Sequence, residues 1–127
     1  MKKLLLLPLL IVTLFCFAQD SKEIIGKSIK IGNLLVAKYD FPVEMNWEDA
    51  GKACHNLGKG WRLPTKYELN LLYENLDKIG GFSVVEYCYW SSAEYNNSNS
   101  WRQNFFYGRQ FKYLKISKCN VRAVRSL

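Results

Sequence analysis

The sequence lacks the paired ligands and nucleophile motifs on which most metal and hydrolytic sites depend. It contains one histidine, His55, and no CxxC pair, so we expect no metal site. It has no GxSxG, Walker or HExxH motif, and Ser91-Ser92 has no histidine near it in the sequence. Cys54 and His55 would point about 100° apart on a helix, which disfavours a catalytic dyad. These absences predict a protein that is not an enzyme and needs no cofactor.

The carboxylates give no stronger indication of catalysis. A paired acid/base site needs two carboxyl groups that face each other across a cleft. Helix starts and solvated helix faces account for the candidates, which are Glu48, Asp49, Glu68 and Glu74.

What the chain does have begins with an export signal. A basic pair at residues 2–3 precedes the apolar run Leu4 to Phe17, and a small-x-small site ends at Ala18. A retained anchor would need roughly 17–25 apolar residues, and this run is shorter and contains Pro8. We therefore predict a signal peptide, residues 1–18, and a product without a transmembrane helix in the periplasm, at the cell surface or outside the cell.

The predicted mature chain, residues 19–127, has the size of one domain. Without the basic pair at residues 2–3 it keeps 16 basic and 11 acidic side chains, a formal charge of +5. This balance favours polyanions or anionic surfaces, and it equally fits a domain that uses net charge for solubility.

Three cysteines remain in the predicted mature chain: Cys54, Cys88 and Cys119. In an oxidising compartment the simplest arrangement is one disulfide and one free thiol, and three pairings are open. Cys54 lies in a helical pattern, whereas Cys88 and Cys119 lie in strand-like runs of the C-terminal half. This placement favours a Cys88–Cys119 disulfide without excluding the other two pairings.

Local patterns predict a strand or hairpin followed by a helix. Ser28 to Tyr39 alternates with period two and has Gly-Asn between two apolar arms, which is typical of a hairpin. Trp47 to Leu57 has apolar residues at helical spacing, with Asn46 as a cap and Gly58 as a stop.

The stretch GWRLPTKYEL predicts a second helix. Thr65 and Glu68 have the spacing of a capping box, and Pro64 stiffens the approach to it. We expect Trp61 to pack under the turn between the helices. For Arg62 we expect a structural hydrogen-bond network, while an exposed ligand contact remains the alternative.

The remaining chain is rich in aromatic and β-branched residues. The polar loop Glu94 to Ser100 and a tight turn at Gly108 separate short strands. The predicted strands are Tyr87 to Ser91, Trp101 to Tyr107, Arg109 to Lys115 and Asn120 to Val124. Together the elements predict an α+β domain with two helices packed on a small, mainly antiparallel sheet.

The order of motifs resembles a bacterial family of secreted domains of largely unassigned function. That family includes the C-terminal domain of a collagen-like adhesin, and it is similar to the C-type lectin-like fold also used by formylglycine-generating enzymes. The resemblance covers nearly all of the mature chain. The motifs are IKIGN around residues 30–33, MNWEDAGKAC (45–54), GWRLPTKYEL (60–69), YWSSAEY (89–95), WRQNF (101–105) and VRAVR (121–125).

The resemblance implies scaffold roles and argues against two activities. It places Trp61, Arg62, Leu63, Pro64, Thr65, Trp90, Ser91, Val121, Arg122 and Val124 at scaffold positions. The EPN, QPD and WND motifs of calcium-dependent lectins are absent, so calcium-mediated sugar binding is not implied. The closely placed catalytic cysteines of formylglycine-generating enzymes have no match either. Ala123 stands where the family often has a cysteine.

Two functions remain open. The first is an extracytoplasmic binding module for an anionic glycan, because aromatic rings stack on sugar CH groups and Arg or Lys pairs with sulfate or carboxylate. The second is a structural or envelope-assembly protein that binds another protein. Export disfavours a nucleic-acid partner. The candidate ligand-binding residues are Tyr95, Asn96, Asn97, Asn99, Trp101, Arg102, Tyr107, Arg109 and Lys112.

Overall fold

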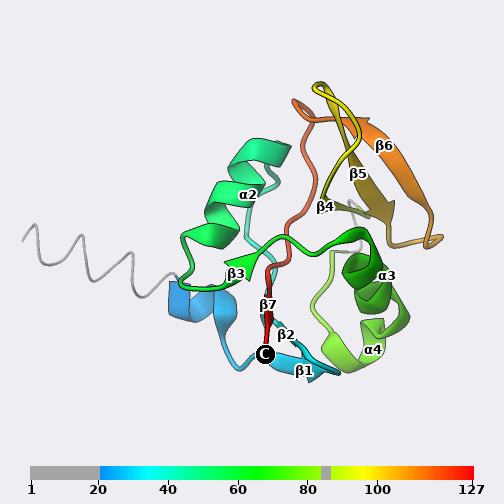
Figure 1. Cartoon of the computed structure of the whole chain (residues 1–127). Helices are drawn as coiled ribbons and strands as arrows, with labels where there is room; N and C mark the ends of the chain where they lie inside the picture. The colour runs from blue at the N-terminus through cyan, green and yellow to red at the C-terminus, as the bar shows by residue number, and fades with distance from the viewer. Residues whose placement is uncertain (1–20, 84–86) are drawn as a thin grey trace, which may run out of the picture.

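The computed structural model describes residues 21–83 and 87–127 (Figure 1). The predicted signal peptide, residues 1–18, lies outside the described residues. Residues 21–25 are helical and hydrogen-bond to the segment after β2, through Lys38 N to Ile25 O at 2.8 Å. Among the described helices, none is long and apolar enough to cross a membrane.

A four-stranded antiparallel sheet joins the start of the domain to its end. Its order is β1-β2-β7-β3, with β1 at Ile29–Ile31, β2 at Leu34–Val36, β3 at Trp61–Arg62 and β7 at Val124–Ser126. The predicted hairpin is confirmed, because β1 and β2 pair around Gly32, whose φ is 58°. The last strand lies between β2 and β3, so the C-terminus closes the sheet.

Two capped helices lie on opposite sides of the central strands (Figure 1). Helix α2, Trp47–His55, begins at Asn46, whose side chain accepts from the Asp49 N–H at 2.9 Å. Helix α3, Lys66–Glu74, begins at Thr65, and the predicted capping box is present in full. A short helix, α4 (Leu76–Ile79), continues the chain toward the second sheet.

The second sheet is a three-stranded antiparallel meander. Its order is β4-β5-β6, with β4 at Cys88–Glu94, β5 at Asn99–Asn104 and β6 at Gln110–Leu114. The first four residues of β4 are buried, which places both faces of this strand inside the domain. Figure 1 shows the meander at the end of the molecule away from the β1–β2 hairpin.

Two apolar clusters fill the interior on either side of β7. One surrounds the fully buried Trp90 and includes Cys54, Leu63 and Val121. The other contains Leu69, Leu72 and Val36, with the stacked rings of Tyr89 and Phe105 at 4.5 Å. The α+β class predicted from the sequence is confirmed, but with two antiparallel sheets where one was expected.

Two predicted strands are displaced. The predicted strand Trp101 to Tyr107 ends instead at Asn104, because the Asn104 side chain accepts from the Phe106 and Tyr107 N–H groups and starts a turn. The predicted strand Asn120 to Val124 is only a bridge at Asn120, and regular pairing starts at Val124. Strand β3 was not predicted at all, because two residues carry no periodic signal.

Candidate functional site

The β5–β6 hairpin distributes the predicted binding residues over its two faces. Trp101 pairs with Lys112, and Arg102 pairs with Phe111. Successive side chains of a strand point to opposite faces, so Trp101 and Arg102 cannot meet one ligand on the same face. We name the side with Tyr95, Asn99, Trp101 and Lys112 the indole face. The side with Arg102, Arg109, Phe111 and Tyr113 is the guanidinium face.

On the indole face, cations already lie over the aromatic rings. Lys66 Nζ from the start of α3 lies 3.6 Å from the centroid of the Trp101 ring. Tyr95 meets the same indole edge to face at 5.9 Å, and Lys112 Nζ lies 4.1 Å from the Tyr95 ring. Trp101 is half-buried, whereas Tyr95 is exposed. The aromatic surface that a ligand can reach is therefore mainly Tyr95.

On the guanidinium face, two arginines alternate with two rings. The Arg102 guanidinium lies 3.9 Å from the Tyr113 ring and 5.7 Å from the Phe111 ring, and Arg109 lies 5.5 Å from Phe111. Within the described ranges, the ion pairs involve neither Arg102 nor Arg109. Cation–π contacts leave the charge available to an anion, whereas carboxylate pairs would consume it. A hollow of about 520 Å³ lies beside Arg109, lined by Tyr107, Gly108 and Phe111 as well.

The asparagine loop is held by its own amides. Asn96 Oδ1 accepts from the Ser98 N–H at 3.0 Å and from the Asn99 N–H at 2.8 Å. Asn99 Nδ2 also donates to Asn96 Oδ1, at 3.2 Å. Two of the three predicted amides thus organise the loop, and Asn97 is exposed beside them.

The tip of the hairpin exposes two aromatic side chains. Tyr107 is 68 % exposed, and its neighbour Phe106, which the sequence did not single out, is 63 % exposed. Their rings contact each other edge to face at 5.1 Å. Gly108 follows with a φ of 82°, and a Cβ there would approach the Tyr73 ring to 2.4 Å. The tip therefore lies tightly against the end of α3 while it presents apolar surface to solvent.

Charge is divided unequally along the chain. Every acidic residue lies at or before Glu94, whereas seven basic residues follow it. These are Arg102, Arg109, Lys112, Lys115, Lys118, Arg122 and Arg125. This asymmetry was visible in the sequence and is a stronger signal than the net charge, because it locates the excess on the hairpin and the closing segment.

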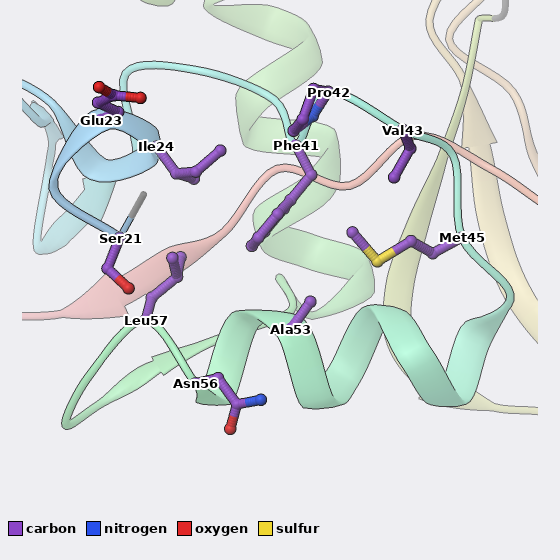
Figure 2. Close-up of a pocket in the computed structure, with 10 residues that line it drawn as sticks. All are labelled: Ser21, Glu23, Ile24, Phe41, Pro42, Val43, Met45, Ala53, Asn56 and Leu57. Carbon is purple, nitrogen blue, oxygen red and sulfur yellow. The ribbon is translucent and has the colours of Figure 1, made fainter. Parts of the chain in front are cut away.

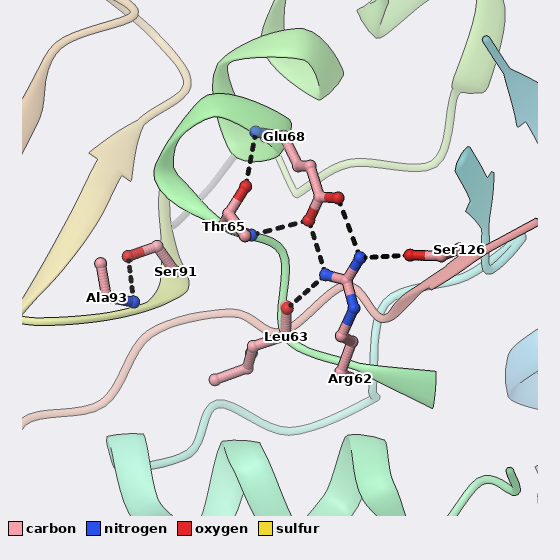
Figure 3. Close-up of polar contacts among 7 residues, drawn as sticks. All are labelled: Arg62, Leu63, Thr65, Glu68, Ser91, Ala93 and Ser126. Carbon is pink, nitrogen blue, oxygen red and sulfur yellow. Dashed lines mark hydrogen bonds and ion pairs between the residues drawn. The ribbon is translucent and has the colours of Figure 1, made fainter. Parts of the chain in front are cut away.

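The side chains at the GWRLPT corner form a hydrogen-bond network within the domain (Figure 3). Arg62 makes two bonds to the Glu68 carboxylate, at 2.6 and 2.9 Å, and donates to Ser126 Oγ at 2.8 Å. Glu68 also accepts from the Thr65 N–H at 2.9 Å. The bond to Arg62 holds the pKa of Glu68 below its ordinary value, and the bond to Glu68 raises the pKa of Arg62. The Glu68 carboxylate thus caps α3 and bonds to Arg62 of β3, and Arg62 in turn bonds to Ser126 of β7.

Arg122 anchors the interior. Its Nε donates to Asp40 at 2.7 Å, and its Nη atoms donate to the carbonyls of Ala37 and Gly80 at 3.2 Å each. Tyr89 donates its hydroxyl to the other Asp40 oxygen at 2.5 Å. Burial raises the pKa of Asp40, against the opposing effect of Arg122, and burial also raises the pKa of Tyr89. The sequence marked Arg122 as structural but did not identify Asp40 as its partner.

The other predicted scaffold residues lie in the core. Trp61 is 5 % exposed within β3, and Trp90 is fully buried with its indole N–H donated to Met45 O at 2.8 Å. Pro64 is buried, and its carbonyl accepts from the Ser92 N–H at 2.8 Å.

A separate apolar pocket of about 480 Å³ lies between residues 21–25, the 41–45 segment and α2 (Figure 2). Phe41, Val43, Met45 and Leu57 form much of its wall, and polar groups are confined to Ser21, Glu23 and Asn56. Its lining suits apolar groups rather than anions. None of the predicted binding residues lies there.

Two of the three thiols meet in the interior. The Cys88 and Cys119 thiols influence each other's pKa and the Cys88 thiol donates to Lys118 O at 3.8 Å, whereas Cys54 lies on α2. All three are free thiols in the structure, so the Cys88–Cys119 disulfide stays a prediction. Within residues 21–83 and 87–127, no three His, Cys, Asp or Glu side chains are grouped so as to hold a metal ion.

The comparisons identify a family and a fold. A family model described as the Lcl C-terminal domain matches residues 27–125. A search of curated proteins gives no significant match. Among solved structures, the snake venom toxin convulxin is similar with a TM-score of 0.63 and 14 % identity, over 80 % of this chain and 96 % of that chain.

Botrocetin, another C-type lectin-like snake venom protein, gives a TM-score of 0.58 at 10 % identity, over 80 % of this chain and 98 % of that chain. A complex of botrocetin with a von Willebrand factor A1 domain mutant gives a TM-score of 0.52 at 14 % identity, with the same coverage. At these identities the similarity shows a C-type lectin-like fold.

Proposed function

The chain belongs to the Lcl C-terminal domain family, and from the geometry of its hairpin we propose a non-catalytic binding module for anionic glycans. The observation that carries the proposal is the guanidinium face. Arg102 and Arg109 lie over aromatic rings there and take part in none of the ion pairs among the described residues.

The chemistry of this face fits a sulfated or carboxylated polymer. A guanidinium offers a planar set of donors that matches sulfate or carboxylate oxygens, and a ring beside it can pack on the CH groups of a sugar. The hollow next to Arg109 gives such a group a place to sit. Lys112 and Tyr95 on the indole face extend the basic and aromatic surface around the edge strand β6.

A protein partner is the second candidate, and a different observation favours it. Phe106 and Tyr107 expose apolar surface at the hairpin tip, which is typical of a protein interface. The structurally similar botrocetin occurs in a complex with a von Willebrand factor A1 domain. A partner of this chain would be a surface or envelope protein, since we propose that the chain is exported and cleaved after Ala18.

The two candidates are distinguished by binding of the mature chain, residues 19–127, to immobilised dextran sulfate, heparin and neutral dextran. We expect binding to the two sulfated polymers that resists EDTA and weakens with salt. Arg102→Ala and Arg109→Ala should each weaken it about threefold to tenfold, as expected for a partly exposed charge.

Arg125→Ala is the matched control, because Arg125 is an exposed cation on β7, outside the hairpin. It should change the affinity little. No binding to either sulfated polymer, or equal losses for Arg125→Ala and Arg109→Ala, would overturn the glycan proposal. Phe106→Ser would then test the protein interface.

A further inference from the structure

Cys88 and Cys119 are brought together by backbone pairing on both sides. Tyr89 and Asn120 form a parallel bridge, so the cysteines that precede them occupy neighbouring positions on adjacent segments. The Asn120 N–H donates to Cys88 O at 2.9 Å, and Cys119 exchanges two backbone bonds with Met45 at 3.0 Å each. Neighbouring strands lie about 4.8 Å apart, which is within the range of Cα separations that a disulfide spans.

The two thiols of the pair are not equivalent. Cys88 is 7 % exposed, whereas Cys119 has no exposed surface. The hydrogen bond from the Cys119 thiol lowers the pKa of Cys88, and the positive charge of Arg102 acts in the same direction. The same hydrogen bond raises the pKa of Cys119. Cys88 is therefore both the more accessible sulfur and the one more readily deprotonated.

Arg102 is placed to act on this pair from β5. Arg102 pairs with Trp90 of β4, and Trp90 lies two residues after Cys88. The side chains of Arg102 and Cys88 therefore project to the same face of β4–β5. The Arg102 Nε is buried without a hydrogen-bond partner among the described residues, and so is Glu44 Oε1, whose carboxylate also acts on both thiols. Arg102 favours the thiolate and Glu44 opposes it.

The third cysteine provides an internal contrast. Cys54 is fully buried on α2, and burial alone raises its pKa to about 12. No charged group acts on it in the way that Arg102 acts on Cys88. The protein thus contains one activated pair and one inert thiol.

We propose that Cys88 and Cys119 form an oxidisable pair in which Cys88 attacks an external disulfide and Cys119 resolves the product, with Arg102 as a positioning residue. In the first step the Cys88 thiolate bonds to one sulfur of the external disulfide and expels the other as a thiolate. In the second step Cys119 loses its proton and bonds to the Cys88 sulfur, which expels the second external thiolate. The protein loses two protons and two electrons, and the external disulfide is reduced to two thiols. This inference shares Arg102 with the proposed glycan site, but its readout, the oxidation state of the thiols, needs no glycan.

The first test uses the mature wild-type chain, equilibrated with oxidised glutathione and mapped by mass spectrometry without reduction. We expect a Cys88–Cys119 crosslink and an unmodified Cys54. Three free thiols at equilibrium, or a crosslink that includes Cys54, would overturn the proposal.

Two variants test the order of attack. Cys119→Ala should accumulate a glutathione adduct on Cys88, because nothing resolves it, whereas Cys88→Ala should leave Cys119 unmodified. Equal modification of the remaining cysteine in both variants would contradict the assigned roles. Because a core substitution can loosen the fold, each variant is compared with Cys54→Ala, which should still form the crosslink.

The role of Arg102 is tested by the pH profile of glutathione incorporation in the Cys119→Ala background. Arg102→Gln should move the midpoint for Cys88 upward by about half a pH unit, and Arg102→Lys should restore it. An unchanged midpoint in Arg102→Gln would remove Arg102 from the proposal.

Discussion

Arginine has different roles in the two sheets. Around the four-stranded sheet, Arg122 and Arg62 each bond to a carboxylate and to further oxygens. Their charge is thus neutralised within the chain. In the three-stranded sheet, Arg102 and Arg109 lie over aromatic rings and take no part in the ion pairs of the described residues.

The difference shows that the exposure of an arginine and the groups bonded to it locate a binding surface better than the presence of arginine alone. A buried guanidinium must be neutralised and hydrogen-bonded, or the fold loses several kcal/mol. Arg109, an exposed cation near the Phe111 ring, has no such obligation and keeps its charge for a ligand. The first sheet is therefore the scaffold, and the second sheet presents the candidate site.

The largest expected effect comes from removing the scaffold guanidinium. Arg122→Met leaves Asp40 buried beside a fully buried apolar side chain, and we expect a loss of about 3–5 kcal/mol in the free energy of unfolding. Arg109→Met, the matched change in the hairpin, should cost less than about 0.5 kcal/mol. Urea titrations followed by tryptophan fluorescence measure both, and similar losses would break the comparison.

A pair of glycines sharpens the comparison between the two hairpins. Gly108 and Gly32 both have positive φ, but a Cβ at Gly108 would come to 2.4 Å from the Tyr73 ring, whereas nothing lies within 4 Å of a Cβ at Gly32. Gly32→Ala should cost about 1 kcal/mol, which reflects the backbone alone. Gly108→Ala should cost about 2–3 kcal/mol, because the ring must also move. Equal thermal shifts would mean that the hairpin does not depend on its contact with α3.

The Arg62–Glu68 pair should make the free energy of unfolding depend on pH. The pKa of Glu68 is held below its ordinary value, so its carboxylate stabilises the fold above the unfolded pKa of about 4.3 and loses that effect as pH falls through the lower folded pKa. The Arg62 side chain is 36 % exposed, so screening limits the ion pair to under about 1 kcal/mol, to which the capping box adds about 1 kcal/mol.

Glu68→Gln should therefore cost about 1–2 kcal/mol at pH 7, and the difference from wild type should narrow toward pH 3. Glu74→Gln is the control, since Glu74 is exposed at the end of α3 and, among the described residues, its carboxylate accepts from the Asn70 side chain. A constant difference across this pH range would contradict the role given to the Glu68 carboxylate.

The helix caps were predicted well from the sequence, whereas the pairing of distant strands was predicted poorly. The Thr65–Glu68 capping box and the Asn46 cap are confirmed, because each depends on residues three apart. The split into two sheets and the short strand β3 depend on contacts between distant segments, for which a single sequence gives no periodic signal.

The candidate site was predicted in composition but not in arrangement. Trp101 and Arg102 were both predicted as ligand-binding residues, but the alternation of β5 places them on opposite faces. The strand assignment already contained this information. The position of Lys66 over the Trp101 ring could not be predicted, because it depends on how α3 packs on the sheet.

The most direct test of the account is the salt dependence of binding to heparin. For the mature wild-type chain we predict a linear fall of log K with log salt concentration, as counterions are released from the polyanion. Arg109→Gln should reduce the slope by about one, and Arg125→Gln should leave it unchanged. An unchanged slope in Arg109→Gln, or a larger reduction in Arg125→Gln, would contradict the assignment of the free charge to the hairpin.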